Sequence, residues 1–485
     1  MNLHPNIDTV FSPDETKKLV GELALCLETY YRSCQSMDSR TVPPLTPSLF
    51  LDIVKKEMRE NNSSFSYLAK LVLDNGHHLH DPRYMGHQVP PSIPAAALFD
   101  VLGRASNQGA AVFEMAPFGT AAERAVVNEL GKMVGWSEGS FAGIGTHGGT
   151  LANVTALLAA RNLRYPQFWK EAQSDTKLKP TIVTSADSHY CIARACGILG
   201  IGTSNLIKVP VDSKRKMDLL KARKILETAK ARSLDVFAIV GSACTTPTGS
   251  FDDLVGIGEL AKEFKIWFHV DGAHGASFLF SEKHKNLLKG IELSDSVTWD
   301  AHKMLFVPAL STYLLYKRKS DSWAAFAQDA PYLFDPKDPE GLAEYDGGLR
   351  TFECTKGALS LALWGVWSLY GKEFLASLIE KAMENTLTLY QMIKESSDFE
   401  AAHTPQCNIL CFRFNPEGKE KDGSLLSEIQ KKVRKALLNE GHGYITGTAI
   451  EGHYWLRVTV INPLTTQKEF GTLLEKIRQI ASQSS

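Results

Sequence analysis

Ile266-Trp-Phe-His-Val-Asp271 and Ser296-Val-Thr298 are the two stretches of sequence that decide the fold. Each is a short run that favours a buried strand, and the first ends in Asp271. Similar runs occur at residues 181–184, 206–209, 236–240 and 311–316, and helical patterns lie between them at 150–162, 189–199, 216–230 and 252–264. Strands that alternate with helices predict an α/β fold with a mostly parallel sheet covered on both faces.

The patterns divide the chain into three predicted domains. Residues 1–88 are expected to form a helical N-terminal arm, residues 89–355 a large α/β domain, and residues 356–485 a small α+β C-terminal domain. Within the large domain, residues 321–349 are polar, poorly periodic and interrupted by prolines and glycines. Such a segment is typical of a lid loop.

The composition excludes several classes of protein. The chain has 485 residues, with 53 Lys+Arg, 54 Asp+Glu and a net charge of -1, so no basic excess draws it to nucleic acid or to an anionic membrane. We expect no secretory signal, because the start lacks a basic segment followed by an apolar one, and no membrane span. The eight cysteines contain no CxxC pair, which favours a reducing, cytoplasmic compartment.

Asp271 and Lys303 are the strongest candidates for chemistry, because each follows or ends a predicted strand. In a parallel sheet the carboxyl ends of the strands line the ligand crevice. An aspartate and a lysine at that edge suit pyridoxal 5'-phosphate (PLP), which bonds to a lysine and whose ring nitrogen pairs with an acidic residue. Either residue alone would more simply be an ordinary ion pair or a loop residue.

Three further motifs support this interpretation. Gly145-Thr-His-Gly148-Gly149-Thr150 precedes a helical pattern, and a helix N-terminus suits a phosphate, although a Gly-rich turn alone can be a simple cap. His189 follows the strand at 181–184 and is placed to stack on a cofactor ring. Thr246 follows the strand at 236–240 and is placed to hydrogen-bond the cofactor. The simpler alternatives are that His189 is a structural histidine and that Thr246 belongs to an ordinary turn.

The order of these motifs resembles the PLP-dependent group II amino-acid decarboxylases, a family that includes the aromatic amino-acid, glutamate, cysteine sulfinate and 2,4-diaminobutyrate decarboxylases. The resemblance extends from about Asp81 to Pro463. It implies a PLP-dependent transferase type I fold, a homodimer, and decarboxylation of an L-amino acid to the primary amine and carbon dioxide.

The resemblance also implies a role for each matching residue around the cofactor ring. Lys303 would bind PLP covalently, and Asp271 would pair with the ring nitrogen. Ala273 and His189 would cover the two faces of the ring, and Thr246 would bond a ring substituent.

Other matches concern the phosphate and the proton. Gly149, Thr150 and His302 would contact the cofactor phosphate. Tyr332, in the lid, matches the tyrosine that helps to protonate the substrate carbon after carbon dioxide leaves. A tyrosine at this position favours simple decarboxylation over the aldehyde-forming branch of the family.

Two positions depart from the family pattern. Asp300-Ala301 stands where the family often has Asn or Asp followed by Pro. An aspartate beside a phosphate would be repulsive, so we assign Asp300 no phosphate contact. Lys356 follows Thr355 where many members have Ser-Arg, and its role is left open.

The substrate is expected to be acidic: glutamate, aspartate or cysteine sulfinate. Gln88 and Arg457 match the pair that holds a substrate carboxylate in that branch of the family, and His87 lies beside Gln88 in the sequence. An arginine also binds the α-carboxylate of any amino acid, so 2,4-diaminobutyrate and aromatic amino acids stay open as substrates. Another PLP carbon–carbon lyase, an aldehyde-forming enzyme, an aminotransferase and a non-catalytic scaffold are the remaining alternatives.

No metal site is expected. The histidines at 77, 78, 80 and 87 are close in sequence, but they lack a cysteine or carboxylate partner at a recognisable spacing. The cysteines are predicted to be core residues.

Overall fold

The computed structural model describes residues 6–43, 46–171, 178–326, 342–416 and 423–482. These residues group into two compact units, each described here by itself. The central unit comprises Gln88–Tyr390 and His403–Leu410, and the terminal unit comprises the described parts of Met1–His87, Gln391–Ala402 and Cys411–Ser485. No helix in the described ranges combines the length and the apolar composition needed to cross a membrane.

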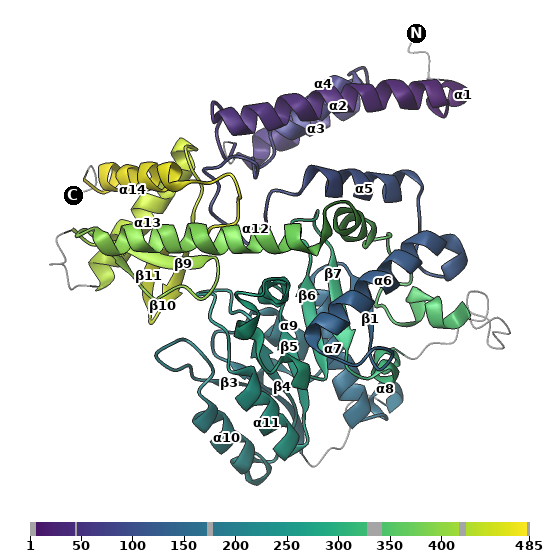
Figure 1. Ribbon diagram of the computed structural model, residues 1–485, viewed down its shortest axis with the longest axis vertical. Coiled ribbons are helices and arrows are strands. Elements are labelled where there is room, and N and C mark those ends of the chain that lie inside the picture. The colour runs from purple at the N-terminus through teal and green to yellow at the C-terminus, as the bar shows by residue number, and fades with distance from the viewer. Residues whose placement is uncertain (1–5, 44–45, 172–177, 327–341, 417–422, 483–485) are drawn as a thin grey trace. The chain divides into compact units, whose positions relative to one another are not determined.

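The central unit is built on a seven-stranded sheet with the order β1-β7-β6-β5-β4-β2-β3 (Figure 1). The strands are β1 (Ala142–Thr146), β2 (Lys179–Ser185), β3 (Leu206–Val209), β4 (Leu234–Ser242), β5 (Trp267–Asp271), β6 (Ser296–Asp300) and β7 (Thr312–Tyr316). Strands β3, β2, β4, β5 and β6 pair in parallel, whereas β7 runs antiparallel to both β6 and β1. The predicted mostly parallel sheet is therefore confirmed.

Both faces of this sheet are covered. All five residues of β1, β5, β6 and β7 are buried. Because successive side chains of a strand point to opposite faces, continuous burial requires packing on both sides. The α-helices that lie wholly within the central unit are α5 (Pro94–Ala105), α6 (Pro117–Val134), α7 (Gly149–Arg164), α8 (Phe168–Glu171), α9 (Cys191–Ile198), α10 (Leu219–Thr228) and α11 (Leu254–Phe264). Helix α7 packs across β4 to β7, and α11 packs against β4 and β5.

Strand β1 is absent from the sequence prediction, and it places one end of the sheet. Its sequence, Ala-Gly-Ile-Gly-Thr, has little of the β-branched and aromatic character that marks a strand. Thr146, at its end, pairs with Thr312 at the start of β7, which pairs in turn with Asp300 at the end of β6. The glycine-rich turn after β1 and the end of β6 therefore lie at the same edge of the sheet.

The terminal unit contains helices and a small four-stranded sheet of order β10-β11-β9-β8. Its strands are β8 (Phe399–Ala401), β9 (Ile409–Phe414, whose first two residues are grouped with the central unit), β10 (Thr446–Ile450) and β11 (His453–Thr459). Its helices are α1 (Ile7–Val10), α2 (Pro13–Ser36), α3 (Pro47–Glu60), α4 (Phe65–Asp74), α13 (Gly423–Glu440) and α14 (Gln467–Ser482). Pro13 occupies the first turn of α2, and the Ser12 hydroxyl accepts a hydrogen bond from the Glu15 amide, a favourable N-cap.

The compact units are grouped differently from the three predicted domains. Helix α12 (Leu361–Glu395) has a non-helical glycine, Gly371, inside it, and its residues up to Tyr390 belong to the central unit. The helical N-terminal segment and the C-terminal α+β segment share one unit. The division into three domains stays a prediction.

Candidate active site

A cavity of about 340 Å³ lies at the carboxyl edge of the sheet in the central unit. Its volume falls in the range of about 300–1,000 Å³ typical of small-molecule sites. Nine residues singled out in the sequence line it: Gln88, Gly149, Thr150, His189, Thr246, Asp271, Ala273, His302 and Lys303. The structure therefore brings together side chains that follow β1, β2, β4, β5 and β6.

Lys303 follows β6, and its Nζ lies 3.0 Å from Oδ2 of Asp300. About 24% of the lysine side chain is exposed, and it faces the cavity. Burial by itself would lower the pKa of Lys303, but the carboxylates of Asp300 and Asp271 outweigh burial and raise that pKa. At neutral pH the amine carries a proton, which it must lose before it can act as a nucleophile.

Asp300 is the partner that the sequence did not assign. It ends β6, is 2% exposed, and accepts a 2.6 Å hydrogen bond from the Thr312 hydroxyl. Burial would raise the pKa of Asp300, but Lys303, His302 and Thr312 together hold it below its usual value. The result is a buried carboxylate that holds the Lys303 ammonium.

Asp271 ends β5 and presents its carboxylate to the same cavity. One oxygen accepts a hydrogen bond from the Ala273 amide at 3.3 Å, and the other lies 3.9 Å from Cys191 Sγ. The Asn153 amide donates to the same sulfur at 3.2 Å. Burial raises the pKa of the Cys191 thiol, so the group beside Asp271 is a neutral thiol.

A buried polar chain continues from Asn153 beneath the cavity. His269 Nε2 donates to Asn153 Oδ1 at 2.6 Å, and the Thr298 hydroxyl donates to the same oxygen at 2.9 Å. His269 Nδ1 lies 2.8 Å from the Ser296 hydroxyl. Burial lowers the pKa of His269 to about 3, so this imidazole is neutral at physiological pH. The chain fixes Asn153, and with it the neighbourhood of Asp271, by neutral hydrogen bonds.

His189 lies between β2 and α9 and lines the cavity. Its Nδ1 accepts a hydrogen bond from the Cys191 amide at 3.3 Å. Burial lowers the pKa of His189, and Lys303 and Arg194 act in the same direction, whereas Asp271 and Asp300 oppose them. A neutral ring with one nitrogen engaged is suited to packing against a flat ligand.

The glycine-rich turn forms another wall of the cavity. Gly148 caps α7 with a φ of 95°, a conformation that favours glycine, and Gly149 is the first residue of the helix. A β-carbon on Gly149 would lie 3.0 Å from the Asp300 carboxylate oxygens and 3.4 Å from Cβ of Ala273. The first amides of a helix have no partner within it, so this turn presents N–H groups to an anion.

Three predicted residues are not part of the described central unit. His87 and Arg457 belong to the terminal unit. Arg457 is 6% exposed on β11 and donates to the Thr459 hydroxyl at 3.1 Å. His87 Nε2 lies 2.8 Å from the Tyr444 hydroxyl, and burial, then the positive charges of Arg457 and Arg434, lower the pKa of His87. Tyr332 lies outside the described residues.

Sequence reasoning missed several residues of the cavity wall: His147, Asn153, Cys244, His274, Asp300 and Leu310. One signal was available for Asn153, which stands four residues after Gly149 on α7 and therefore on the same helical face. His147 is paired with Glu353, at 2.8 Å between Nδ1 and Oε1. His147 and Glu353 are far apart in the chain, so no local sequence pattern could predict this contact.

Comparison with known proteins gives a family match over most of the chain. Residues 56–415 match the family model described as the pyridoxal-dependent decarboxylase conserved domain. The chain is 30% identical over 391 residues to the L-aspartate decarboxylase dtxS4 of Metarhizium robertsii, covering 79% of this chain and 77% of that protein.

Solved structures show the same fold. Mouse CSAD superimposes with a TM-score of 0.90 at 24% identity, covering 97% of this chain and 99% of that chain. The glutamate decarboxylase domain of diaminobutyrate-pyruvate transaminase and L-2,4-diaminobutyrate decarboxylase from Vibrio parahaemolyticus gives a TM-score of 0.85 at 24% identity, covering 99% and 98%. The expected PLP-dependent transferase type I fold is confirmed.

Proposed function

The chain belongs to the pyridoxal-dependent decarboxylase family and is a PLP-dependent amino-acid decarboxylase, and from this premise we propose that its substrate is L-aspartate, converted to β-alanine and carbon dioxide. The relative that is 30% identical over 391 residues is named an L-aspartate decarboxylase. The proposal also agrees with the acidic substrate expected from Gln88 and Arg457.

The observation that carries the catalytic proposal is the arrangement of Lys303, Asp300 and Asp271 around one cavity. The residues present fit PLP in three respects. A lysine amine faces the cavity, a carboxylate ends the neighbouring strand, and a helix N-terminus opens on the same space through glycines. A β-carbon on Gly149 would lie 3.0 Å from the Asp300 carboxylate oxygens, so the turn favours a residue without a side chain here.

We assign roles to the residues of this cavity as follows. Lys303 would hold the cofactor covalently, and Asp271 would keep the ring nitrogen protonated. His189 and Ala273 would pack on the ring, and Thr246 would bond one of its substituents. When bound, PLP takes up the electron pair of the substrate's Cα–carboxylate bond as carbon dioxide departs.

The phosphate would be held at the start of α7. The N–H groups of Gly149 and Thr150, aided by the helix dipole, suit its charge. His302 would face the phosphate with Nε2, because its Nδ1 lies 2.8 Å from the Ser311 carbonyl oxygen. With the Nδ1 proton engaged there, donation from Nε2 to the phosphate requires the doubly protonated imidazolium. Asp300 is given no phosphate contact, since its carboxylate is engaged with Thr312 and Lys303.

Substrate orientation and the final proton transfer fall to other residues. Gln88 on the cavity wall and Arg457, with His87, would bind the substrate carboxylates, and an arginine can do so through two parallel hydrogen bonds. Tyr332 would supply the proton at Cα. The lid that carries Tyr332 would exclude water during the reaction.

We further propose a homodimer in the cytoplasm. The terminal unit exposes apolar side chains along its helices, among them Leu51, Val54 and Met58 of α3. An apolar stripe that the chain itself leaves open is suited to a second copy. The balanced charge and the absence of a CxxC pair agree with a reducing compartment.

The test is carbon dioxide release from a panel of L-amino acids with added PLP. The panel comprises glutamate, aspartate, cysteine sulfinate, 2,4-diaminobutyrate, ornithine, lysine, DOPA and tryptophan. We expect aspartate to give the highest kcat/KM, with β-alanine formed in equal amount. Faster release of carbon dioxide from 2,4-diaminobutyrate or an aromatic amino acid would be consistent with a decarboxylase but would contradict the proposal of an acidic substrate.

The matched control is Lys303→Ala. This variant should lose turnover and covalent PLP attachment, which borohydride reduction and mass spectrometry would detect, while the folded structure persists. Full activity in Lys303→Ala would contradict the role given to this lysine. Ammonia and peroxide release in proportion to carbon dioxide would instead indicate an aldehyde-forming enzyme.

A further inference from the structure

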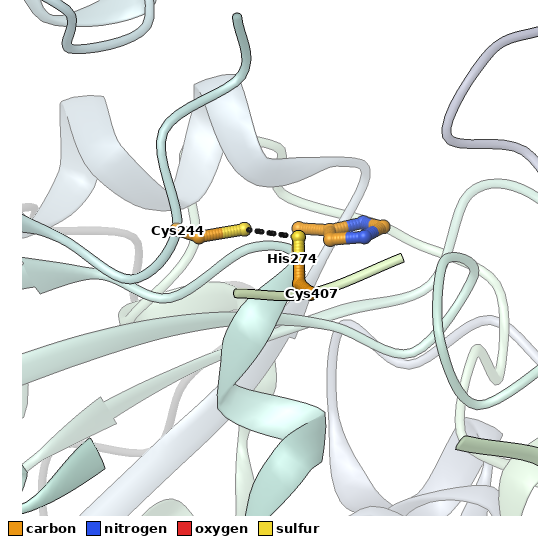
Figure 2. A group of neighbouring side chains, drawn as sticks. All are labelled: Cys244, His274 and Cys407. Carbon is orange, nitrogen blue, oxygen red and sulfur yellow. Dashed lines mark hydrogen bonds between the residues drawn. The ribbon is translucent and has the colours of Figure 1, made fainter. Parts of the chain in front are cut away.

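A second group of side chains lies at the wall of the cavity and has no part in the proposed reaction; Cys244 and His274 line the cavity, and Cys407 lies next to them outside its lining. Cys244, His274 and Cys407 are all buried, and one potential ligand atom from each lies within 4.8 Å of the others. Figure 2 shows the two sulfur atoms facing each other beside the His274 ring. The histidines at 77–87, which drew attention in the sequence, are not in this group.

The fold brings these three residues together through neighbouring loops of the central unit. Cys244 follows β4, and His274 follows the adjacent strand β5. The Gly275 amide donates to the Ala243 carbonyl at 3.0 Å, and the Ala243 amide donates to the Asp271 carbonyl at 2.9 Å. These bonds tie the two loops into one frame.

Cys407 reaches this frame from the segment before β9. The neighbouring Gln406 accepts a hydrogen bond from the Phe251 amide at 3.2 Å. Gly249 has a φ of 72°, and a β-carbon there would overlap Cys407 Sγ, so the turn is closely fitted around the sulfur. The position of Cys407 is therefore set by packing as well as by its link to β9.

We propose that Cys244, Cys407 and His274 form a binding site for a thiophilic divalent cation such as Zn²⁺. The three donors are a set that zinc prefers. In a tetrahedral site with Zn–S of about 2.3 Å, two sulfurs stand about 3.8 Å apart. The observed Sγ–Sγ distance is 3.6 Å, so the sulfur pair already has the required separation.

The hydrogen bonding of His274 also fits metal coordination. Its Nε2 lies 2.7 Å from Oδ1 of Asn408, an oxygen that only accepts, so Nε2 carries the proton and Nδ1 is the coordinating nitrogen. With Zn–N of about 2.0 Å, a sulfur and a nitrogen ligand stand about 3.5 Å apart. One ring nitrogen of His274 lies within 4.8 Å of both sulfurs, so coordination requires the ring to rotate or shift toward them.

The chemistry of the surroundings also favours metal binding over a simple sulfur pair. Cys244 and His274 line the cavity, which gives a cation a path to the site and a place for a fourth, water ligand. A disulfide would need the sulfurs to approach to about 2.05 Å and would give His274 no role.

The experiment titrates the reduced holoenzyme with Cd²⁺, which reports thiolate ligands by a charge-transfer band in the ultraviolet. We expect one tightly held ion with the band of two thiolates. Cys407→Ser should lower the affinity by on the order of 100-fold or more and remove half of the band. Cys196→Ser, which alters a buried cysteine outside the group, is the matched control and should bind as the unaltered protein does.

A second variant keeps the proposal testable if Cys407→Ser does not fold. Asn408→Ala should keep both thiolates and the full band but lower the affinity by about 10–100-fold, because the imidazole loses its orienting partner. Equal Cd²⁺ affinity and an equal band in the unaltered protein and Cys407→Ser would overturn the proposal. So would failure to bind Cd²⁺ combined with a Cys244–Cys407 disulfide found by peptide mapping after mild oxidation, which would make the pair a redox site.

Discussion

At the scale of single residues, the contact between Asp300 and Lys303 determines the protonation state of the lysine amine. The lysine must be a neutral amine to react with an aldehyde, yet Asp300 holds it as an ammonium at 3.0 Å. Asp300 is itself kept ionised by Lys303, His302 and Thr312, so the pair is mutually reinforcing. The carboxylate therefore orients the amine at the expense of its reactivity at low pH.

Asp300→Asn should consequently shift the pH dependence of covalent PLP uptake toward lower pH. Removal of the Asp300 charge, which favours the ammonium, lowers the pKa of Lys303, so more neutral amine is present at a given pH. Asparagine keeps the size of the side chain and can still accept from Thr312. The measurement is the rate of borohydride-trapped PLP attachment to the apoprotein between pH 6 and 10.

Asp295→Asn provides the control for that shift. Asp295 is also near β6, but it binds Arg318 and the Phe268 amide instead of Lys303. The pH profile of PLP attachment in Asp295→Asn should match that of the unaltered protein. An Asp300→Asn profile with the same midpoint would show that another group sets the protonation of Lys303.

At the scale of secondary-structure elements, a buried ion pair anchors the start of the glycine-rich turn. Lys356 Nζ lies 2.9 Å and 2.8 Å from the two carboxylate oxygens of Glu123 on α6, and donates to the Gly145 carbonyl on β1 at 2.7 Å. The lysine side chain is 1% exposed. The residue whose role the sequence left open thus ties α6 and β1 together behind the proposed phosphate site.

Lys356→Met should destabilise the protein by about 3–5 kcal/mol at pH 7, because it leaves Glu123 buried without its cation. Burial raises the pKa of Glu123, and Lys356 brings it below its usual value. Without Lys356 the pKa rises, so the loss should shrink as the pH falls and the carboxyl becomes neutral. Urea denaturation at pH 7 and pH 5 measures both effects.

The double variant Glu123→Leu/Lys356→Met isolates the pair from the rest of the packing. With both charges removed, most of the stability should return, since no unpaired ion stays buried. A double variant as unstable as Lys356→Met would indicate that the lysine acts through its bond to Gly145 rather than through Glu123.

The sequence predicted most elements of the central sheet, and the exceptions have physical reasons. Asp271 and Lys303 were found because strand periodicity places both at strand ends. Strand β1 was missed because Gly143 is required by packing: a β-carbon there would lie 2.7 Å from the Leu315 side chain and 2.9 Å from that of Val127. Cys407 and His274 meet only through tertiary structure, which no local pattern encodes.

At the scale of the whole molecule, the N-terminal helices bear on assembly. Leu51, Val54 and Met58 recur at helical spacing on α3 and are 52%, 53% and 76% exposed. A stripe of this kind is costly to leave in water, at about 25 cal/mol per Å² of apolar surface. A second copy of the chain would cover it.

Val54→Glu should therefore weaken the proposed dimer, because association would bury the new carboxylate among apolar side chains. We expect sedimentation velocity to show about twice the mass of one chain for the unaltered protein, and a species of single-chain mass for Val54→Glu at micromolar concentration. Lys56→Glu changes an exposed charged residue of the same helix and should leave the dimer intact. If both variants sediment as dimers, the subunits associate through another surface and the α3 stripe has a different role.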